Sequence, residues 1–305
     1  MAFQALVAAG ALLALAVPVT SMPQPAEQTA PVEVVTVKTD LHDRMTVPVR
    51  IGKDGPFDFL VDTGAERTVL ARDIAQKLRL PTSGHGMLIG IAGMQTVDLV
   101  EIDEINLGRR SYYGLTAPLL EGRNIGADGI IGLDSLQDQR VLLDFAKGRM
   151  AIGDAMALGG NRGFEIVVQA RRRSGQLIMT NAVIDGVRTD IVIDTGSDTS
   201  IGNRALQRAL AKRRKGETTE LQSVTGQFIT ADISLVRELK LGSMTMSNAT
   251  LVFADTPAFA KLAMEKRPAM FLGMNQLRLF HRVAIDFSTR RILFDMPENA
   301  LPASF

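Results

Sequence analysis

Cysteine and tryptophan are absent from the 305-residue chain, and there are only three histidines. The lack of cysteine excludes disulfides, a thiol nucleophile, thiol redox chemistry and a lipid attached to cysteine. His42, His85 and His281 are scattered without the spacing of a zinc site, and no Gly-x-Ser-x-Gly turn displays a serine for a Ser-His-Asp triad. We therefore expect no metal and no cofactor, and interpret the histidines as structural or exposed.

The chain also lacks an excess of positive or negative charge, because 34 basic and 33 acidic residues give a net charge of +1. This balance argues against a nucleic-acid partner, and the short basic runs at 171–173 and 212–215 are interpreted as solvated surface. The apolar content of 46% and charged content of 22% are typical of a soluble globular protein. The length is enough for two lobes, each with its own core.

Long apolar runs are limited to the N-terminus, where residues 5–19 are rich in Ala and Leu. This run is shorter than the roughly 20 residues of a membrane span, and small residues precede a cleavage position after Ser21. We predict a signal peptide over 1–21, a flexible lead-in over 22–40 and no membrane span in the mature chain. An exported chain without disulfides fits a bacterial periplasm, with an N-terminal membrane anchor if the signal is not cleaved.

The triplet Asp-Thr-Gly occurs twice, at 62–64 and at 194–196, and each copy follows an apolar run. A strand that runs into a glycine turn presents its carboxylate at a fixed point. The two aspartates, Asp62 and Asp194, are 132 residues apart (194 − 62). Two such turns in one chain predict two carboxylates that meet at a pseudo-symmetric site.

The surroundings of the two triplets repeat in the same order, which indicates an internal duplication. In each half we predict a hairpin, the triplet, a short helix, a glycine-bearing segment, an apolar-Gly element and two closing strands. For the two halves these are 47–55 and 181–186, 62–64 and 194–196, 72–80 and 204–212, 89–96 and 223–230, 129–133 and 270–274, 141–145 and 283–287, and 150–152 and 292–294. We therefore predict an N-terminal lobe over 41–153, a linker over 154–163 and a C-terminal lobe over 164–297.

A carboxylate pair can hydrolyse an amide without a metal or a covalent intermediate. Two carboxyls within hydrogen-bond distance cannot both ionise, so they share one proton and titrate as a unit. The ionised partner then acts as a base toward water, and the protonated partner acts as an acid toward a carbonyl oxygen.

On these motifs the chain resembles a retropepsin-like aspartic protease with both catalytic halves fused in one polypeptide. The resemblance rests on Val-Asp-Thr-Gly-Ala at 61–65, Gly-Ile-Ile-Gly at 129–132, Val-Ile-Asp-Thr-Gly-Ser at 192–197 and Phe-Leu-Gly at 271–273. It implies a mainly all-β, bilobal acid-protease-like fold made of two β-barrel-like lobes with short helices. It also implies an aspartic endopeptidase, a hydrolase in which Asp62 and Asp194 are catalytic.

The resemblance assigns roles to the neighbouring residues as well. Thr63 and Thr195 would bond across to the opposite loop, and Gly64 and Gly196 would allow close backbone approach. Two flaps, at 87–97 and 221–231, would cover a peptide or protein substrate bound as an extended strand, through Gly90, Ile91, Gly93, Thr225 and Gly226. Since both motifs lie in one chain, we expect a monomer.

The residue after each triplet suggests an asymmetry between the two acids. Ser197 follows the second triplet, and its hydroxyl could donate a hydrogen bond to Asp194 and favour the ionised form there. Ala65 at the matching place offers Asp62 no such bond. The shared proton is then expected on Asp62.

Two alternatives stay open at this point. The duplicated β scaffold could bind peptides without cutting them, because a motif does not prove turnover. The repeated turns also resemble those of an actin-like ATPase, a fold that needs long helices after its sheets and a glycine-rich nucleotide site.

Overall fold

The computed structural model describes residues 33–36, 38–39, 44–210 and 217–297. The predicted signal peptide over 1–21, most of the lead-in, and the end of the helix predicted over 204–212 lie outside the described residues. Within the described ranges no helix has the length and apolar character needed to cross a membrane.

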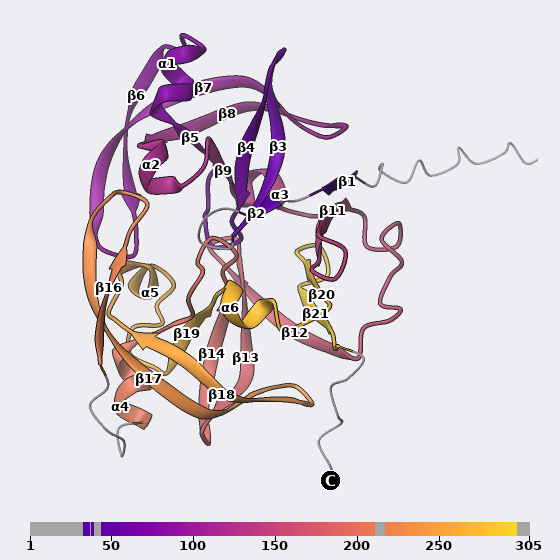
Figure 1. The fold of residues 1–305 in the computed structure, drawn as a ribbon, viewed down its shortest axis with the longest axis vertical. Helices are drawn as coiled ribbons and strands as arrows, with labels where there is room; N and C mark the ends of the chain where they lie inside the picture. The colour runs from indigo at the N-terminus through magenta and orange to yellow at the C-terminus, as the bar shows by residue number, and fades with distance from the viewer. Residues whose placement is uncertain (1–32, 37, 40–43, 211–216, 298–305) are drawn as a thin grey trace, which may run out of the picture.

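Two lobes with the same strand order make up the molecule (Figure 1). The N-terminal lobe is an eight-stranded sheet in the order β2-β3-β4-β9-β5-β8-β7-β6, and an additional β3–β7 pairing folds the sheet back on itself. Its strands are β2 Lys38–Thr39, β3 Met45–Ile51, β4 Asp54–Val61, β5 Val69–Ala71, β6 Thr82–Ile89, β7 Met94–Leu107, β8 Arg110–Leu120 and β9 Gly129–Ile131.

The C-terminal lobe repeats this order as β12-β13-β14-β19-β15-β18-β17-β16, with the matching additional pairing β13–β17. Its strands are β12 Ile166–Arg173, β13 Gln176–Ile184, β14 Val187–Ile193, β15 Ile201–Gly202, β16 Thr218–Gln222, β17 Phe228–Leu241, β18 Met244–Phe253 and β19 Ala269–Leu272. The internal duplication read from the sequence is therefore a duplication of strand topology, and the mainly β, two-lobed fold class is confirmed.

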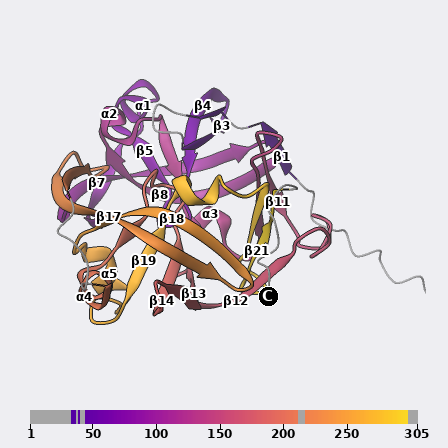
Figure 2. The same cartoon turned by 60° about the horizontal axis from the view of Figure 1, so that its bottom comes forward.

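The closing strands of both halves join in one sheet that connects the lobes (Figure 2). The strands are β1 Glu33–Thr36, β10 Arg140–Asp144, β11 Arg149–Gly153, β20 Arg282–Asp286 and β21 Arg291–Asp295. Strands β10 and β20 pair antiparallel across the lobe boundary, with Leu142 opposite Ala284. At one end of this pairing the buried Arg140 and Asp286 form an ion pair at 2.7 Å. Residues 154–165 contain no strand and connect the lobes.

The end of the predicted flexible lead-in over 22–40 forms strands instead, which corrects the prediction there. Residues 33–36 form β1, which pairs with β11, and residues 38–39 form β2, which pairs with β3. A run of valine and threonine favours the extended backbone, and the edge of β11 offers backbone groups that need partners.

The helices are short connections between strands. They are α1 Arg72–Lys77, α2 Gly122–Ile125, α3 Leu133–Leu136, α4 Arg204–Leu210, α5 Pro257–Lys261 and α6 Met274–Leu277. The helix predicted over 72–80 ends earlier, at Lys77, because Arg79 takes a φ of 56° and the Leu80 N–H closes the turn on the Ala75 carbonyl at 3.0 Å. The longest described helix has seven residues, so the long helices of an actin-like ATPase are not part of the described fold.

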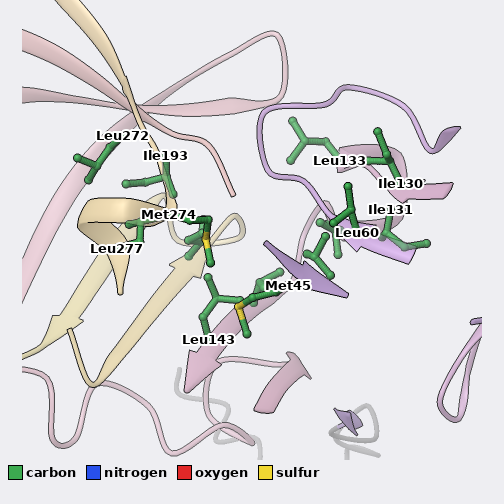
Figure 3. Close-up of a cluster of buried hydrophobic side chains, with 14 of the residues drawn as sticks. Met45, Leu60, Ile130, Ile131, Leu133, Leu143, Ile193, Leu272, Met274 and Leu277 are labelled. Atoms are coloured by element: carbon green, nitrogen blue, oxygen red, sulfur yellow. The ribbon is translucent and has the colours of Figure 1, made fainter. Parts of the chain in front are cut away.

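The main cluster of buried apolar side chains extends through both lobes (Figure 3). Leu60 and Ile131 from the N-terminal lobe and Ile193 and Leu272 from the C-terminal lobe belong to the same cluster. Leu60 and Ile193 lie on the strands that end at the Asp-Thr-Gly turns, and Ile131 and Leu272 lie on the parallel strands beside them, so the base of the site is supported by one continuous core.

Candidate active site

Each Asp-Thr-Gly turn begins where a buried strand ends against a parallel neighbour. Strand β4 runs parallel to β9, and β14 runs parallel to β19. The pairing continues one residue into each turn, since the Asp62 N–H donates to the Ile131 carbonyl and the Asp194 N–H to the Leu272 carbonyl, both at 3.0 Å. A parallel neighbour on an apolar core therefore fixes the backbone of both aspartates.

The two turns are joined by hydrogen bonds between the threonines of opposite lobes. The Thr63 hydroxyl donates to the Ile193 carbonyl at 2.9 Å, and the Thr195 hydroxyl donates to the Val61 carbonyl at 2.6 Å. Each hydroxyl also accepts from the other threonine's backbone N–H, at 3.0 Å for Thr63 N and 3.4 Å for Thr195 N. Both side chains are buried, so every polar atom of this crossing has a partner inside the protein.

Each glycine of the triplets lies directly against the carboxylate of the other lobe. A Cβ on Gly196 would lie 2.2 Å from Asp62 Oδ2, and a Cβ on Gly64 would lie 2.9 Å from Asp194 Oδ1. Real Cβ atoms do not come this close to another heavy atom, so only glycine leaves room for the two acids to meet. The structure thus brings Asp62, Asp194, Thr63, Thr195, Gly64 and Gly196 together.

The two carboxyl groups are in hydrogen-bond contact with each other. Burial raises the pKa of Asp62 above its ordinary value, although N–H donation from Gly64 (2.7 Å) and Ala65 (3.0 Å) opposes this. Burial, together with the negative charge of Asp62, raises the pKa of Asp194 well above its ordinary value. The arrangement therefore retains one proton between two acids, as like charges at short range require.

Ser197 lies beside the dyad, but its hydroxyl is oriented differently from the sequence-based expectation. The hydroxyl donates to the Thr199 carbonyl at 2.8 Å within its own loop. It is the Ser197 backbone N–H that acts on Asp194. The expected side-chain bond is wrong because a nearby carbonyl satisfies the hydroxyl locally.

A second pair of hydroxyls lies beneath the turns, and the sequence had shown them as part of the repeat without indicating a role. The Thr68 hydroxyl accepts from the Gly132 N–H at 3.2 Å, and the Ser200 hydroxyl accepts from the Gly273 N–H at 2.8 Å. Both hydroxyls are buried, at positions related by the same offset of 132 (200 − 68). They connect the apolar-Gly elements to the loops that carry the dyad. Thr68 and Ser200 are separated by the same 132 residues as Asp62 and Asp194, and this equal spacing was the signal in the sequence that could have revealed their role.

Arg44 and Gln176 are also related by this offset (176 − 44) and were also missed. Their exposed fractions are 8% and 6%. Arg44 Nη1 donates to the Gly196 carbonyl at 3.4 Å, and Gln176 Nε2 donates to the Gly64 carbonyl, so each contacts the opposite lobe's triplet. Different side-chain chemistry at the two positions concealed the equivalence in the sequence.

The predicted flap residues lie at the tips of two hairpins that meet (Figure 1). Gly90, Ile91 and Gly93 form the tip between β6 and β7, and Thr225 and Gly226 form the tip between β16 and β17. A Cβ on Gly90 would lie 2.6 Å from Ser223 Oγ, and one on Gly93 would lie 3.0 Å from Gln227 Oε1. The second tip also contacts α2, where Gln222 Nε2 donates to Asn124 Oδ1 at 3.4 Å. Substrate contact at these tips stays a prediction.

Each flap is anchored to its own lobe by an arginine at the start of a helix. Arg72, the first residue of α1, pairs with Asp98 on β7 at 2.8 Å. Arg204, the first residue of α4, pairs with Asp232 on β17. The flaps therefore share an anchoring geometry as well as a topology.

Among the described residues no group of three or more His, Cys, Asp or Glu side chains could hold a metal ion. What the dyad itself offers is a half-buried acid and a half-buried base in contact, at the boundary of two lobes. That is a donor set for proton transfer to and from an uncharged group such as an amide and its attacking water.

Comparison with known proteins assigns this arrangement to a family. The family model described as aspartyl protease matches residues 47–135 and 180–276, which together are more than half of the chain. The two matches contain one Asp-Thr-Gly turn each and correspond to the two lobes. No curated protein matches the chain in sequence. The chain belongs to the retropepsin-like aspartyl protease family.

Proposed function

We propose that the protein is an aspartic endopeptidase that hydrolyses peptide bonds with the Asp62/Asp194 dyad. The observation that carries the proposal is the contact between the two half-buried carboxyls at the boundary of the lobes, where reciprocal threonine bonds hold the two turns together. Family membership supports the same chemistry.

In this mechanism the ionised carboxyl removes a proton from water as the water oxygen attacks the carbonyl carbon of the peptide bond. The protonated carboxyl donates its proton to the carbonyl oxygen, which gives a neutral tetrahedral diol. In the breakdown of the diol the protonated carboxyl donates its proton to the amide nitrogen while the ionised carboxyl removes a proton from a diol hydroxyl, so the C–N bond breaks and the dyad again holds one proton. Burial supports this cycle because it disfavours a doubly ionised dyad.

The substrate in this proposal is an extended peptide beneath the two flap tips. An extended strand satisfies its backbone groups by pairing with the edge of a neighbouring sheet, and β6 and β16, which lead into the two tips, are each the last strand in their sheet. We also propose that the protein acts as a monomer exported to a bacterial periplasm. This part is supported by the two motifs in one chain, the apolar segment at 5–19 and the lack of cysteine.

The test is a mixed peptide library incubated with the wild type, Asp62→Asn and Asp194→Asn, with the cuts mapped by mass spectrometry. We expect cuts with the wild type and none with either variant. Asp138→Asn is the matched control, because Asp138 is exposed and its φ of 61° suits asparagine. This control should cut like the wild type. A folded wild type that retains peptides without cutting them would contradict the proposal and support a peptide-binding scaffold.

A further inference from the structure

The pseudo-symmetry of the site is broken at one pair of positions, 44 and 176. Both side chains are at least nine-tenths buried and donate to a glycine carbonyl of the opposite triplet. Arg44 brings a positive charge to its side of the dyad, whereas Gln176 brings a neutral amide to the other. Arg44 is held there by a second bond, from Nη2 to the Ile125 carbonyl at 2.5 Å.

The charge of Arg44 acts on one aspartate in particular. Arg44 donates to the Gly196 carbonyl, and Gly196 is the residue packed against the Asp62 carboxylate. Gln176 donates to the Gly64 carbonyl, and Gly64 is packed against Asp194. The charge of Arg44 is among the largest effects that lower the pKa of Asp62, while the largest charge effect on the pKa of Asp194 is that of Asp62, which raises it.

The other contacts of the two acids are nearly matched. Asp62 accepts the N–H groups of Gly64 and Ala65, and Asp194 is acted on by those of Gly196 and Ser197. The Ser197 hydroxyl does not distinguish the acids, since it donates to Thr199. The cation at position 44 is therefore the principal difference between the surroundings of Asp62 and Asp194.

We propose that Arg44 is a positioning residue that places the shared proton on Asp194 and leaves Asp62 as the carboxylate that activates water. Its catalytic consequence rests on the proposed peptidase function, but the ionisation asymmetry does not. The proposal reverses the expectation from the sequence, which assigned the proton to Asp62 because of Ser197. A buried cation favours the nearer anion because little water is present to screen it.

The first experiment identifies the ionised acid without any peptide turnover. Phenyl glycidyl ether is the probe: a carboxylate oxygen attacks the terminal epoxide carbon, the ring C–O bond breaks, and the alkoxide takes the proton of the other carboxyl. The product is a hydroxyalkyl ester, which peptide mapping assigns to one residue. We expect the ester on Asp62 in the wild type and in Arg44→Lys, which keeps the charge.

The charge exchange is the decisive variant. In the double variant Arg44→Gln/Gln176→Arg the cation moves to the other side of the pseudo-symmetric site, so the ester should appear on Asp194. Esterification that stays on Asp62 in the double variant, or that divides equally in the wild type, would overturn the proposal. So would the absence of reaction at both aspartates of the folded wild type. Because the probe requires no peptidase activity, these results are separate from a failure of the proposed function.

The second experiment is the pH profile of kcat/KM. Arg44→Gln removes a cation that favours deprotonation at both steps, so both limbs should move to higher pH by about one unit or more. Gln176→Arg adds a second cation and should move both limbs to lower pH, which provides the same test if Arg44→Gln does not fold. The double variant should return both limbs close to the wild type. Lower turnover with unmoved limbs in each folded variant, checked by circular dichroism, would indicate a purely structural role and overturn the proposal.

Discussion

The two lobes have the same strand order but stabilise their glycine elements with different chemistry. In the N-terminal lobe the Thr68 hydroxyl donates to the Asp134 carboxylate at 2.7 Å, and the Thr68 N–H donates to it at 2.9 Å. In the C-terminal lobe the Ser200 hydroxyl is surrounded by the amide side chains of Asn275 and Gln276. The backbone geometry has been kept in both copies while the charge beneath it has not. Symmetry in this protein is therefore a property of the main chain more than of the side chains.

The flaps differ in the same way. Both begin from an Arg–Asp anchor, but only the first has a histidine in the anchor, because His85 lies 3.0 Å from Asp98. The first tip has the small residues Gly90 and Gly93, while the second presents Ser223 and Gln227 to them. The close contact between the tips thus depends on small residues on one side and hydrogen-bonding side chains on the other.

The largest effect is expected when one of the two aspartates is removed at a time, which tests whether both lobes contribute equally to the dyad. Asp62→Asn and Asp194→Asn should each lower kcat roughly 10²–10⁴-fold, because the acid and the base act on one proton. The double variant should be no worse than the single ones, since a unit that has lost one member has already lost its function. Steady-state assays with a cleaved library peptide measure this. Near wild-type turnover in either single variant would contradict a shared dyad.

The next comparison adds a methyl group on each side of the dyad. Gly196→Ala should lower kcat/KM about 10²-fold, because the new Cβ would lie 2.2 Å from Asp62 Oδ2 and must displace the acid. Gly64→Ala should cost less, since its nearest atom, Asp194 Oδ1, is 2.9 Å away. The measurement is kcat/KM for both variants with the same peptide. An equal loss in both would show that the two sides are packed alike.

The hydroxyls beneath the turns give a smaller effect, on stability. Thr68→Val should lower the free energy of unfolding by about 1.5–3 kcal/mol, because its hydroxyl is bonded to a carboxylate. Ser200→Ala should cost about 0.5–1.5 kcal/mol, since its partners are neutral. Urea unfolding followed by circular dichroism measures both values. If Ser200→Ala were the costlier change, the charge of Asp134 would not be what distinguishes the lobes.

Dilution should have no effect on the wild type. Both aspartates come from one chain and the lobes share the β10–β20 pairing, so activity per mole should stay constant from micromolar to nanomolar enzyme. Progress curves at matched substrate concentration measure this. A specific activity that falls along a monomer–dimer curve would mean that the two lobes of one chain do not form the site by themselves.

The parts of the site that could be predicted from the sequence are those with a strict backbone requirement. The hairpin, the Asp-Thr-Gly turn and the apolar-Gly element recur because glycine is needed wherever two loops come close, as at Gly64 and Gly196. Both halves have glycine there because a Cβ would meet another heavy atom at those positions. The order of the elements along the chain in each half followed from the same repetition, whereas the order of the strands within each sheet came from the structure.

The residues that escaped prediction act through side chains whose direction depends on packing. Arg44 lies 18 residues before Asp62 (62 − 44), and only the folded β3–β4 hairpin brings it back to the dyad. The direction of the Ser197 hydroxyl depended on which acceptor it met in the folded loop, and it donates to a carbonyl two residues away. The strand at 33–36 depended on an edge of β11 that does not exist until the lobe has folded.

The segment 154–165, which joins the two halves in one polypeptide, has a consequence for how such a protein can change by mutation. The two subunits of a homodimer have the same sequence, so an arginine beside one aspartate would also lie beside the other. Here the two halves are encoded separately, and one can carry Arg44 while the other carries Gln176. Because both halves lie in one chain, mutations can make the surroundings of the two aspartates different. In a homodimer the surroundings of the two aspartates have the same sequence.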